Sequence, residues 1–171
     1  MKRLGFFTIG LPVVLVVFAL PSVAKTSVEL KDAQGKAVGT VIVWQQGPGV
    51  ALQLNLHGLP PGEHAIHFHT NPKCDAPDFK SAGAHFNPEN KKHGLENPEG
   101  HHAGDMMNFT VDAKGNAKTK LEDKDANLLE DSHSLFSNGG TTIIIHAKAD
   151  DMKTDPSGNS GDRIACGVIT K

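Results

Sequence analysis

The chain has 171 residues, the usual size of one domain. Apolar residues make up 38% of it, charged residues make up 21%, and the formal net charge is only −2, which excludes a disordered chain. The 17 basic residues are outnumbered by 19 acidic ones, which argues against a nucleic-acid-binding protein. The unusual figure is the ten histidines, all of which lie between His57 and His146, so we look for the function there.

The N-terminal 24 residues have the pattern of a secretory signal peptide. Lys2 and Arg3 form a positive start, residues 4–20 are uncharged and mostly apolar, and Ser22-Val23-Ala24 is typical of a cleavage site. An uncleaved membrane anchor is the alternative, because the apolar stretch is at the short limit for a membrane span. We expect cleavage, which leaves a mature domain of residues 25–171 without a stable membrane span. That domain would work in the periplasm, the cell-wall space or the extracellular medium.

Alternation of apolar and polar residues predicts short strands along most of the remaining chain. In chain order they are residues 26–31, 38–44, 52–56, 63–69, 107–111, 117–121, 141–147 and 164–170. Turn residues such as Gln46-Gly47-Pro48-Gly49 separate them. Only residues 128–136 could hold a helical turn. About eight strands without long helical periodicity predict an all-β antiparallel sandwich or barrel.

Two segments of the chain do not fit strands. Residues 70–105 are rich in Pro, Gly, Asn, His and Asp, and residues 150–162 form a shorter loop of the same character. A loop as long as the first is uncommon in a compact domain and is usually functional or disordered. The two cysteines, Cys74 and Cys166, allow one intramolecular disulfide in an oxidising compartment. Two free thiols are the alternative.

His67 and His69 form a His-x-His pair inside a predicted strand. Side chains two positions apart lie on one face of a strand, so both imidazoles point the same way while Ile66 and Phe68 point into the core. Two nitrogen donors on one rigid strand can chelate a transition metal. Two solvated or hydrogen-bonded histidines would show the same pattern.

The long loop supplies a second set of donors. Three imidazoles and one carboxylate suit a tetrahedral zinc ion, and the loop carries them at His85, His93, His102 and Asp105. A bound metal would hold a loop that has no core of its own. A polar loop that is merely rich in histidine is the alternative. His146, near the end of a strand, would by itself be interpreted as a structural histidine.

These residues, taken together, show that the chain resembles the copper–zinc superoxide dismutases, especially their exported bacterial members. Five stretches carry the resemblance in the family's order: residues 62–69 (GEHAIHFH), 83–88 (GAHFNP), 102–105 (HAGD), 146–151 (HAKADD) and 161–169 (GDRIACGVI). The resemblance implies an eight-stranded antiparallel Greek-key sandwich of the Ig-like kind with long metal-binding loops. It also implies dismutation of superoxide by copper, one copper and one zinc ion per subunit, and an antioxidant role outside the cytoplasm. It leaves a monomer and a homodimer both open.

The resemblance further assigns roles to single residues. The implied copper ligands are His67, His69, His85 and His146, and the implied zinc ligands are His85, His93, His102 and Asp105. His85 would bridge the two ions and carry a proton in catalysis. Asp150 would orient one ligand ring on each metal. Arg163 would bind the anionic substrate, and Cys74 and Cys166 match the family's disulfide. Residues 150–163 form a shorter loop than in the eukaryotic enzymes and hold only Lys153 as a further cation, so we ourselves expect Arg163 to supply most of the attraction.

Four histidines remain outside these roles. His64 falls on the core side of its strand, where we expect a buried hydrogen-bonded ring. His101 is the alternative to His102 as a zinc ligand, and the resemblance implies His102, because the two-residue gap to Asp105 is the family's spacing. His57 and His133 are predicted to lie on the surface. Asn108-Phe109-Thr110 matches a glycosylation triplet, but it lies in a predicted strand.

Two other classes of protein share parts of this pattern. One is a non-catalytic copper chaperone or metal-storage domain, and the other is a structural sandwich that binds only zinc. The presence of all seven ligand positions favours the enzyme over both.

Overall fold

The computed structural model of the protein describes residues 24–171, so nearly all of the expected signal peptide lies outside the described residues. The strands are β1 (Lys25–Asp32), β2 (Ala37–Gln46), β3 (Gly49–Leu56), β4 (Gly62–His64), β5 (Ile66–His69), β6 (Phe109–Val111), β7 (Ala117–Asp123), β8 (Thr141–His146) and β9 (Arg163–Ile169). Two short 3-10 helices, η1 (Lys80–Ala82) and η2 (Ser137–Gly139), complete the elements.

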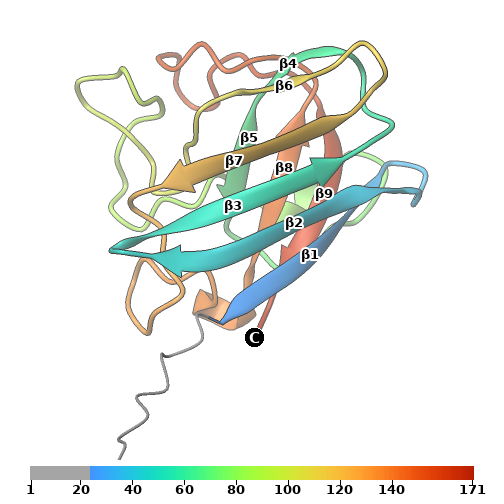
Figure 1. Cartoon of the computed structure of the whole chain (residues 1–171). Coiled ribbons are helices and arrows are strands. Elements are labelled where there is room, and N and C mark those ends of the chain that lie inside the picture. The colour runs from blue at the N-terminus through green and yellow to red at the C-terminus, as the bar shows by residue number, and fades with distance from the viewer. Residues whose placement is uncertain (1–23) are drawn as a thin grey trace, which may run out of the picture.

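Seven strands form one antiparallel sheet in the order β5-β8-β9-β1-β2-β3-β7, and β4 pairs with β6 in a second, two-stranded sheet. The large sheet curls, so that β1, β2, β3 and β7 form one wall and β5, β8 and β9 form the other (Figure 1). The predicted all-β antiparallel class is therefore confirmed.

Two details of the predicted elements are wrong. The expected strand over residues 63–69 is divided at Ala65, because β4 pairs with β6 whereas β5 pairs with β8. Ala65 makes the crossing, since its N–H donates to the Lys148 carbonyl (2.9 Å) and its own carbonyl accepts from the N–H of His146 (3.0 Å). No helical turn forms over residues 128–136, and the nearest one is η2, directly after that segment.

The main core fills the space between the two walls. Leu52, Leu54, Ile66 and Phe68 have no exposed surface there, together with Ile143 and Ile145 from β8. Every residue of β5 and β8 is buried, because the core lies on one side of these strands and the covering loops lie on the other. Side chains that enter the core alternate along each strand with those that point the other way. Ile66 and Phe68 thus point into the core, as expected.

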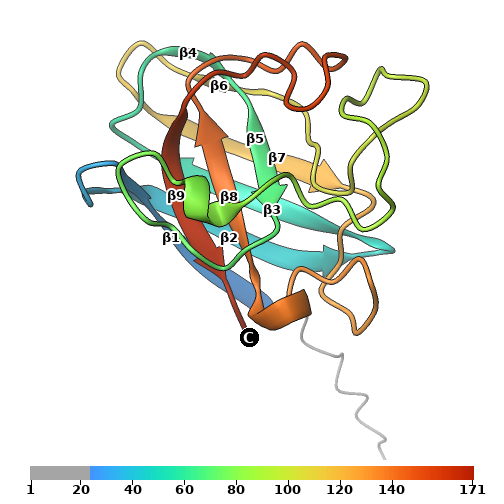
Figure 2. The ribbon, with the colours of Figure 1, turned by 180° about the vertical axis from the view of Figure 1, so that it is seen from behind.

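The opposite face of β5 and β8 carries the histidines. His67 is paired with Ile144 and His69 with Thr142, and directly opposed residues of antiparallel strands project from the same face. Residues 70–105 fold over this outer face, with η1 in front of β9 (Figure 2). A disulfide joins Cys74 in this loop to Cys166 in β9, with 5.7 Å between their Cα atoms. The predicted disulfide is therefore present, and the histidines lie between a rigid sheet and its covering loops.

No helix within residues 24–171 is both long enough and apolar enough to cross a membrane.

Candidate metal centre

Four buried imidazoles converge on the outer face of β5 and β8. The ring nitrogens of His67, His69, His85 and His146 lie within 4.8 Å of one another, and we call these residues the four-histidine group. One nitrogen of each ring is buried without a hydrogen-bond partner among the described residues: Nδ1 of His67 and Nε2 of the other three. Buried nitrogen atoms are costly to leave unpaired, so four of them facing one point indicate a site for a cation that accepts their lone pairs.

The other nitrogen of each strand histidine is held by the protein. His69 Nδ1 donates to the Gly83 carbonyl (3.0 Å), and His146 Nδ1 lies 3.2 Å from the Gly161 carbonyl. A carbonyl oxygen only accepts, so these rings carry their proton on Nδ1 and present the Nε2 lone pair to the site. His67 Nε2 is bonded to Asp150 Oδ2 (2.8 Å), which leaves Nδ1 free. Orientation and tautomer are thus fixed in advance.

A second group shares His85 with the first. The ligand atoms of His85, His93, His102 and Asp105 also lie within 4.8 Å of one another, and we call these residues the zinc-type group. Asp105 Oδ1 lies 2.9 Å from His85 Nδ1, 3.1 Å from His93 Nδ1 and 3.3 Å from His102 Nδ1. Three imidazoles and one carboxylate fit a tetrahedral zinc ion.

His85 belongs to both groups because its two ring nitrogens point in different directions. Its Nδ1 points at the zinc-type group, while its Nε2 has no partner and is one of the converging nitrogens of the four-histidine group. Asp105 is held by backbone donors, because its Oδ2 accepts from the N–H of Gly94 (2.9 Å) and of His102 (3.1 Å). The arrangement can therefore place two cations on opposite sides of one imidazole.

Burial sets the protonation of the four-histidine group. It lowers the pKa of His85 and of His146 to about 3, with further lowering from neighbouring histidines, and it holds the pKa of His69 well below its usual value. These rings are therefore neutral at neutral pH, and their lone pairs are available. His93 differs: burial lowers its pKa, but the carboxylates of Asp105 and Asp150 outweigh that effect and raise the pKa to about 9.

Asp150 connects the two groups. Its Oδ2 lies 2.8 Å from His67 Nε2 and 2.9 Å from His93 Nε2, so it contacts one ring of each group. Burial acts to raise the pKa of this carboxyl, but the bonds to His67 and His93 outweigh it and lower the pKa, so Asp150 is ionised. Asp150 therefore holds one ring of each group.

The two loops over the site are tied to each other. Asp155 Oδ1 accepts from the N–H of His93 (2.8 Å), and the N–H of Glu96 donates to the Met152 carbonyl (3.0 Å). Lys153 forms an ion pair with Glu96 at 2.9 Å. Residues 92–97 and 150–158 are thus joined to each other where they cover the four-histidine group and the zinc-type group.

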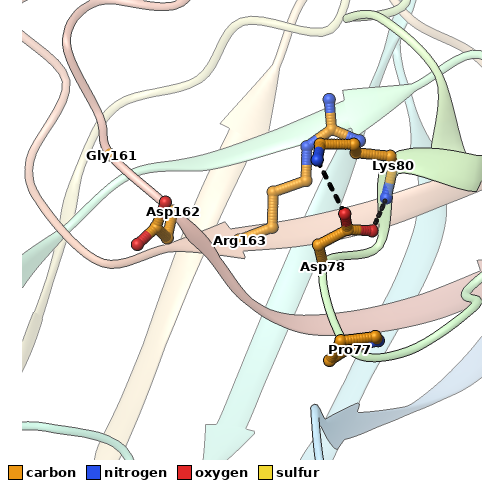
Figure 3. Close-up of a pocket in the computed structure, with 6 residues that line it drawn as sticks. All are labelled: Pro77, Asp78, Lys80, Gly161, Asp162 and Arg163. Atoms are coloured by element: carbon orange, nitrogen blue, oxygen red, sulfur yellow. Dashed lines mark hydrogen bonds and ion pairs between the residues drawn. The ribbon is translucent and has the colours of Figure 1, made fainter.

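Arg163 lines a cavity of about 490 Å³ with Lys80, Asp78, Asp162, Pro77 and Gly161 (Figure 3). Its guanidinium donates to the carbonyls of Phe79 (2.8 Å) and Gly83 (2.7 Å). Gly83 also accepts from His69, so one carbonyl connects Arg163 to the four-histidine group. Arg163 therefore has a structural contact, and it keeps further N–H donors for an anion.

Lys80 is a residue that sequence reasoning missed. It lines the same cavity as Arg163 and forms a 2.8 Å ion pair with Asp78. No motif marks it, because it meets Arg163 only after the loop of residues 70–105 has folded onto β9. A second cavity, of about 540 Å³, is lined in part by His85 and His102.

The remaining histidines mostly follow expectation. His64 is buried, with Nδ1 2.8 Å from the His146 carbonyl and Nε2 2.8 Å from the Pro60 carbonyl. His101 lies outside both groups and contacts Asp125 Oδ2 at 2.8 Å, and His57 is exposed. The surface prediction for His133 is wrong in part, because its ring is half-buried and Nδ1 bonds the Asp125 carbonyl (2.8 Å).

Comparison with known proteins gives one consistent result. The family model described as copper/zinc superoxide dismutase matches residues 37–169. The chain is 46% identical to Cu-Zn superoxide dismutase 1 of Aquifex aeolicus over 91% of this chain and 94% of that protein. A superoxide dismutase-like protein from Bacillus subtilis has a similar crystal structure, with a TM-score of 0.82 and 39% identity over 85% of this chain and 99% of that one. The Cu/Zn superoxide dismutase of Brucella abortus superposes with a TM-score of 0.69 and 30% identity over 85% of this chain and 99% of that one.

Proposed function

The chain belongs to the copper/zinc superoxide dismutase family, an enzyme family, and we propose that it dismutates superoxide with copper at the four-histidine group and zinc at the zinc-type group. Each chain would bind one copper ion and one zinc ion. The observation that carries it is the set of four buried, unpartnered imidazole nitrogens, one of which belongs to a ring shared with the zinc-type group.

Two superoxide anions and two protons give one O₂ and one hydrogen peroxide. Copper, when bound, supplies the one-electron couple that this disproportionation requires, and zinc has no such couple. The chain's own part is to present neutral imidazoles. His69 and His146 do so because their Nδ1 protons are committed to backbone carbonyls. No rotation of these rings is then needed when a metal binds.

His85 is proposed to carry one of the two protons. Its Nε2 faces the other three histidines without a partner. With zinc in place of the proton on Nδ1, the ring could hold a single proton on Nε2, directed into the four-histidine group. The second proton comes from solvent. Zinc at the other face would hold His85 in position and take no part in electron transfer.

Arg163 is proposed to bind the substrate anion. Two of its N–H groups are fixed on Phe79 and Gly83, so the guanidinium is rigid, and its remaining donors suit a small anion. Replacing Arg163 by Glu should lower the bimolecular rate with copper still bound. It should also reverse the salt dependence, so that salt speeds the variant and slows the wild type. A variant whose rate falls with salt as the wild type's does would assign the attraction to other residues.

The place of action is also part of the proposal. The N-terminal pattern of residues 1–24 and the disulfide both suit an exported protein that meets superoxide outside the cytoplasm.

The experiment that tests the function is metal analysis of purified protein together with a direct superoxide-decay assay. The wild type should bind one copper and one zinc ion and be active. His146→Ala removes a residue of the four-histidine group only, so it should abolish activity and retain zinc, whereas His57→Ala, at an exposed histidine, should change neither. Full activity of His146→Ala with copper bound would contradict the ligand assignment. An inactive wild type with both metals bound would contradict the function.

A further inference from the structure

We infer that Asn108 is a positioning residue for both metals, acting through Asp150. The inference rests on the proposed metal site and concerns a contact that neither the sequence motifs nor the donor groups contain. Asn108 directly precedes β6, and its side chain is half-buried.

The contact between Asn108 and Asp150 is reciprocal. Asn108 Nδ2 donates to the Asp150 carbonyl (2.9 Å), and the N–H of Asp150 donates to Asn108 Oδ1 (2.9 Å). Both main-chain polar groups of Asp150 are thus bonded to a single side chain. The two bonds act as a β-bridge would, and they fix the position and the orientation of the Asp150 backbone.

The position of Asp150 matters because its carboxylate serves both groups. It reaches His67 and His93 with distances of 2.8 and 2.9 Å, and hydrogen bonds of this length tolerate little displacement. If the backbone of Asp150 shifted, one ring of the four-histidine group and one ring of the zinc-type group would lose their partner together. Asn108, next to the small β4–β6 sheet, therefore helps to hold the rings of His67 and His93 in their orientation through Asp150.

The same contact accounts for the Asn-x-Thr triplet at residues 108–110. Both polar atoms of the Asn108 amide are used inside the protein, so the amide is not presented to solvent as a glycan acceptor would be. We assign the asparagine to the metal centre.

A double-mutant cycle on metal affinity tests the inference. The variants are Asn108→Ala, Asp150→Ala and the double variant, with Asn55→Ala, at an exposed position of β3, as the control. Dissociation constants for Cu(II) and Zn(II) are measured by chelator competition at a temperature at which circular dichroism shows every variant to be folded. Activity is not needed for this readout.

Asn108→Ala should weaken binding of both metals by about tenfold, the lower end of the effect of losing an outer hydrogen-bond partner. In the Asp150→Ala background the same substitution should have no further effect, because the route through Asp150 is gone. A merely structural role would lower the melting temperature and leave both dissociation constants of the folded protein unchanged.

Three results would overturn the inference: unchanged affinities in Asn108→Ala, an effect on one metal only, or a full tenfold loss in the Asp150→Ala background. A wild type that binds both metals and fails to remove superoxide would refute the proposed function and leave this inference standing.

Discussion

Asp123, at the end of β7, predicts an unusual dependence of stability on pH. Its side chain is 4% exposed, Oδ1 accepts from the N–H groups of Asp125 and Ala126, and Oδ2 has no partner among the described residues. Burial raises the pKa of Asp123 from 3.8 to about 7; the two N–H groups oppose this, and the charges of Asp125 and Asp105 add to it.

The sign of the effect follows from proton linkage. Between about pH 4 and pH 7 the folded chain holds a proton on Asp123 that the unfolded chain has released, so stability falls as the pH rises through this range and then levels off. The shift corresponds to about 4 kcal/mol in total, of which about 3 kcal/mol falls between pH 5 and pH 8.

Asp123→Asn tests this magnitude. Asparagine keeps the Oδ1 acceptor and has no charge to bury, although its amide group would lack a partner, which costs about 1–3 kcal/mol. Relative to wild type, the variant should therefore gain about 3 kcal/mol of stability on going from pH 5 to pH 8.

The assay is urea unfolding of the metal-free protein with its disulfide intact, because metal affinity itself varies with pH. Asp112→Asn is the matched control, since Asp112 is exposed, its pKa is lowered by N–H donors, and it is ionised at both pH values. An equal difference between Asp123→Asn and wild type at pH 5 and pH 8 would refute the reasoning.

Three further predictions concern the covering loops. A Cβ on Gly158 would overlap Asp150 Oδ1, so Gly158→Ala should weaken both metals by about tenfold in chelator competition, and unchanged affinities would contradict the packing. Reducing the Cys74–Cys166 bridge should lower the melting temperature, measured by calorimetry, more in metal-free than in metal-loaded protein, because the disulfide and the metals restrain the same loop of residues 70–105. Equal shifts of the melting temperature in the two forms would contradict a shared restraint. Asp78→Asn removes the ion-pair partner of Lys80 in the cavity that Arg163 lines. The variant should remove superoxide faster, with a steeper dependence on salt, when superoxide is generated in a pulse and its decay is followed. An unchanged rate would show that Lys80 does not attract the substrate.

Local sequence patterns predicted the parts of the site that lie along one strand or one loop. Alternation in β5 was enough to place His67 and His69 on the face opposite Ile66 and Phe68. The preference for His102 over its neighbour came instead from the resemblance, which supplies the spacing to Asp105. The first inference needs only the periodicity of a strand.

Contacts between distant segments could not be predicted in this way. Asn108 meets Asp150, and Lys80 enters the Arg163 cavity, only after loops have folded onto the sheet. The division of the strand at Ala65 depends on two different partners, β6 and β8, which alternation within residues 63–69 does not reveal. Burial of Asp123 is likewise a consequence of packing, since its neighbours in the chain are charged.

We propose above all that two metals would share His85, with its Nε2 among the histidines that would hold copper and its Nδ1 among the residues that would hold zinc. Anomalous diffraction from crystals of the metal-loaded protein, recorded on both sides of the copper and zinc absorption edges, tests it directly. We expect a copper peak among His67, His69 and His146 and a zinc peak beside His93, His102 and Asp105, with His85 between them. A single peak, exchanged metals or a His85 ring that contacts only one ion would contradict it.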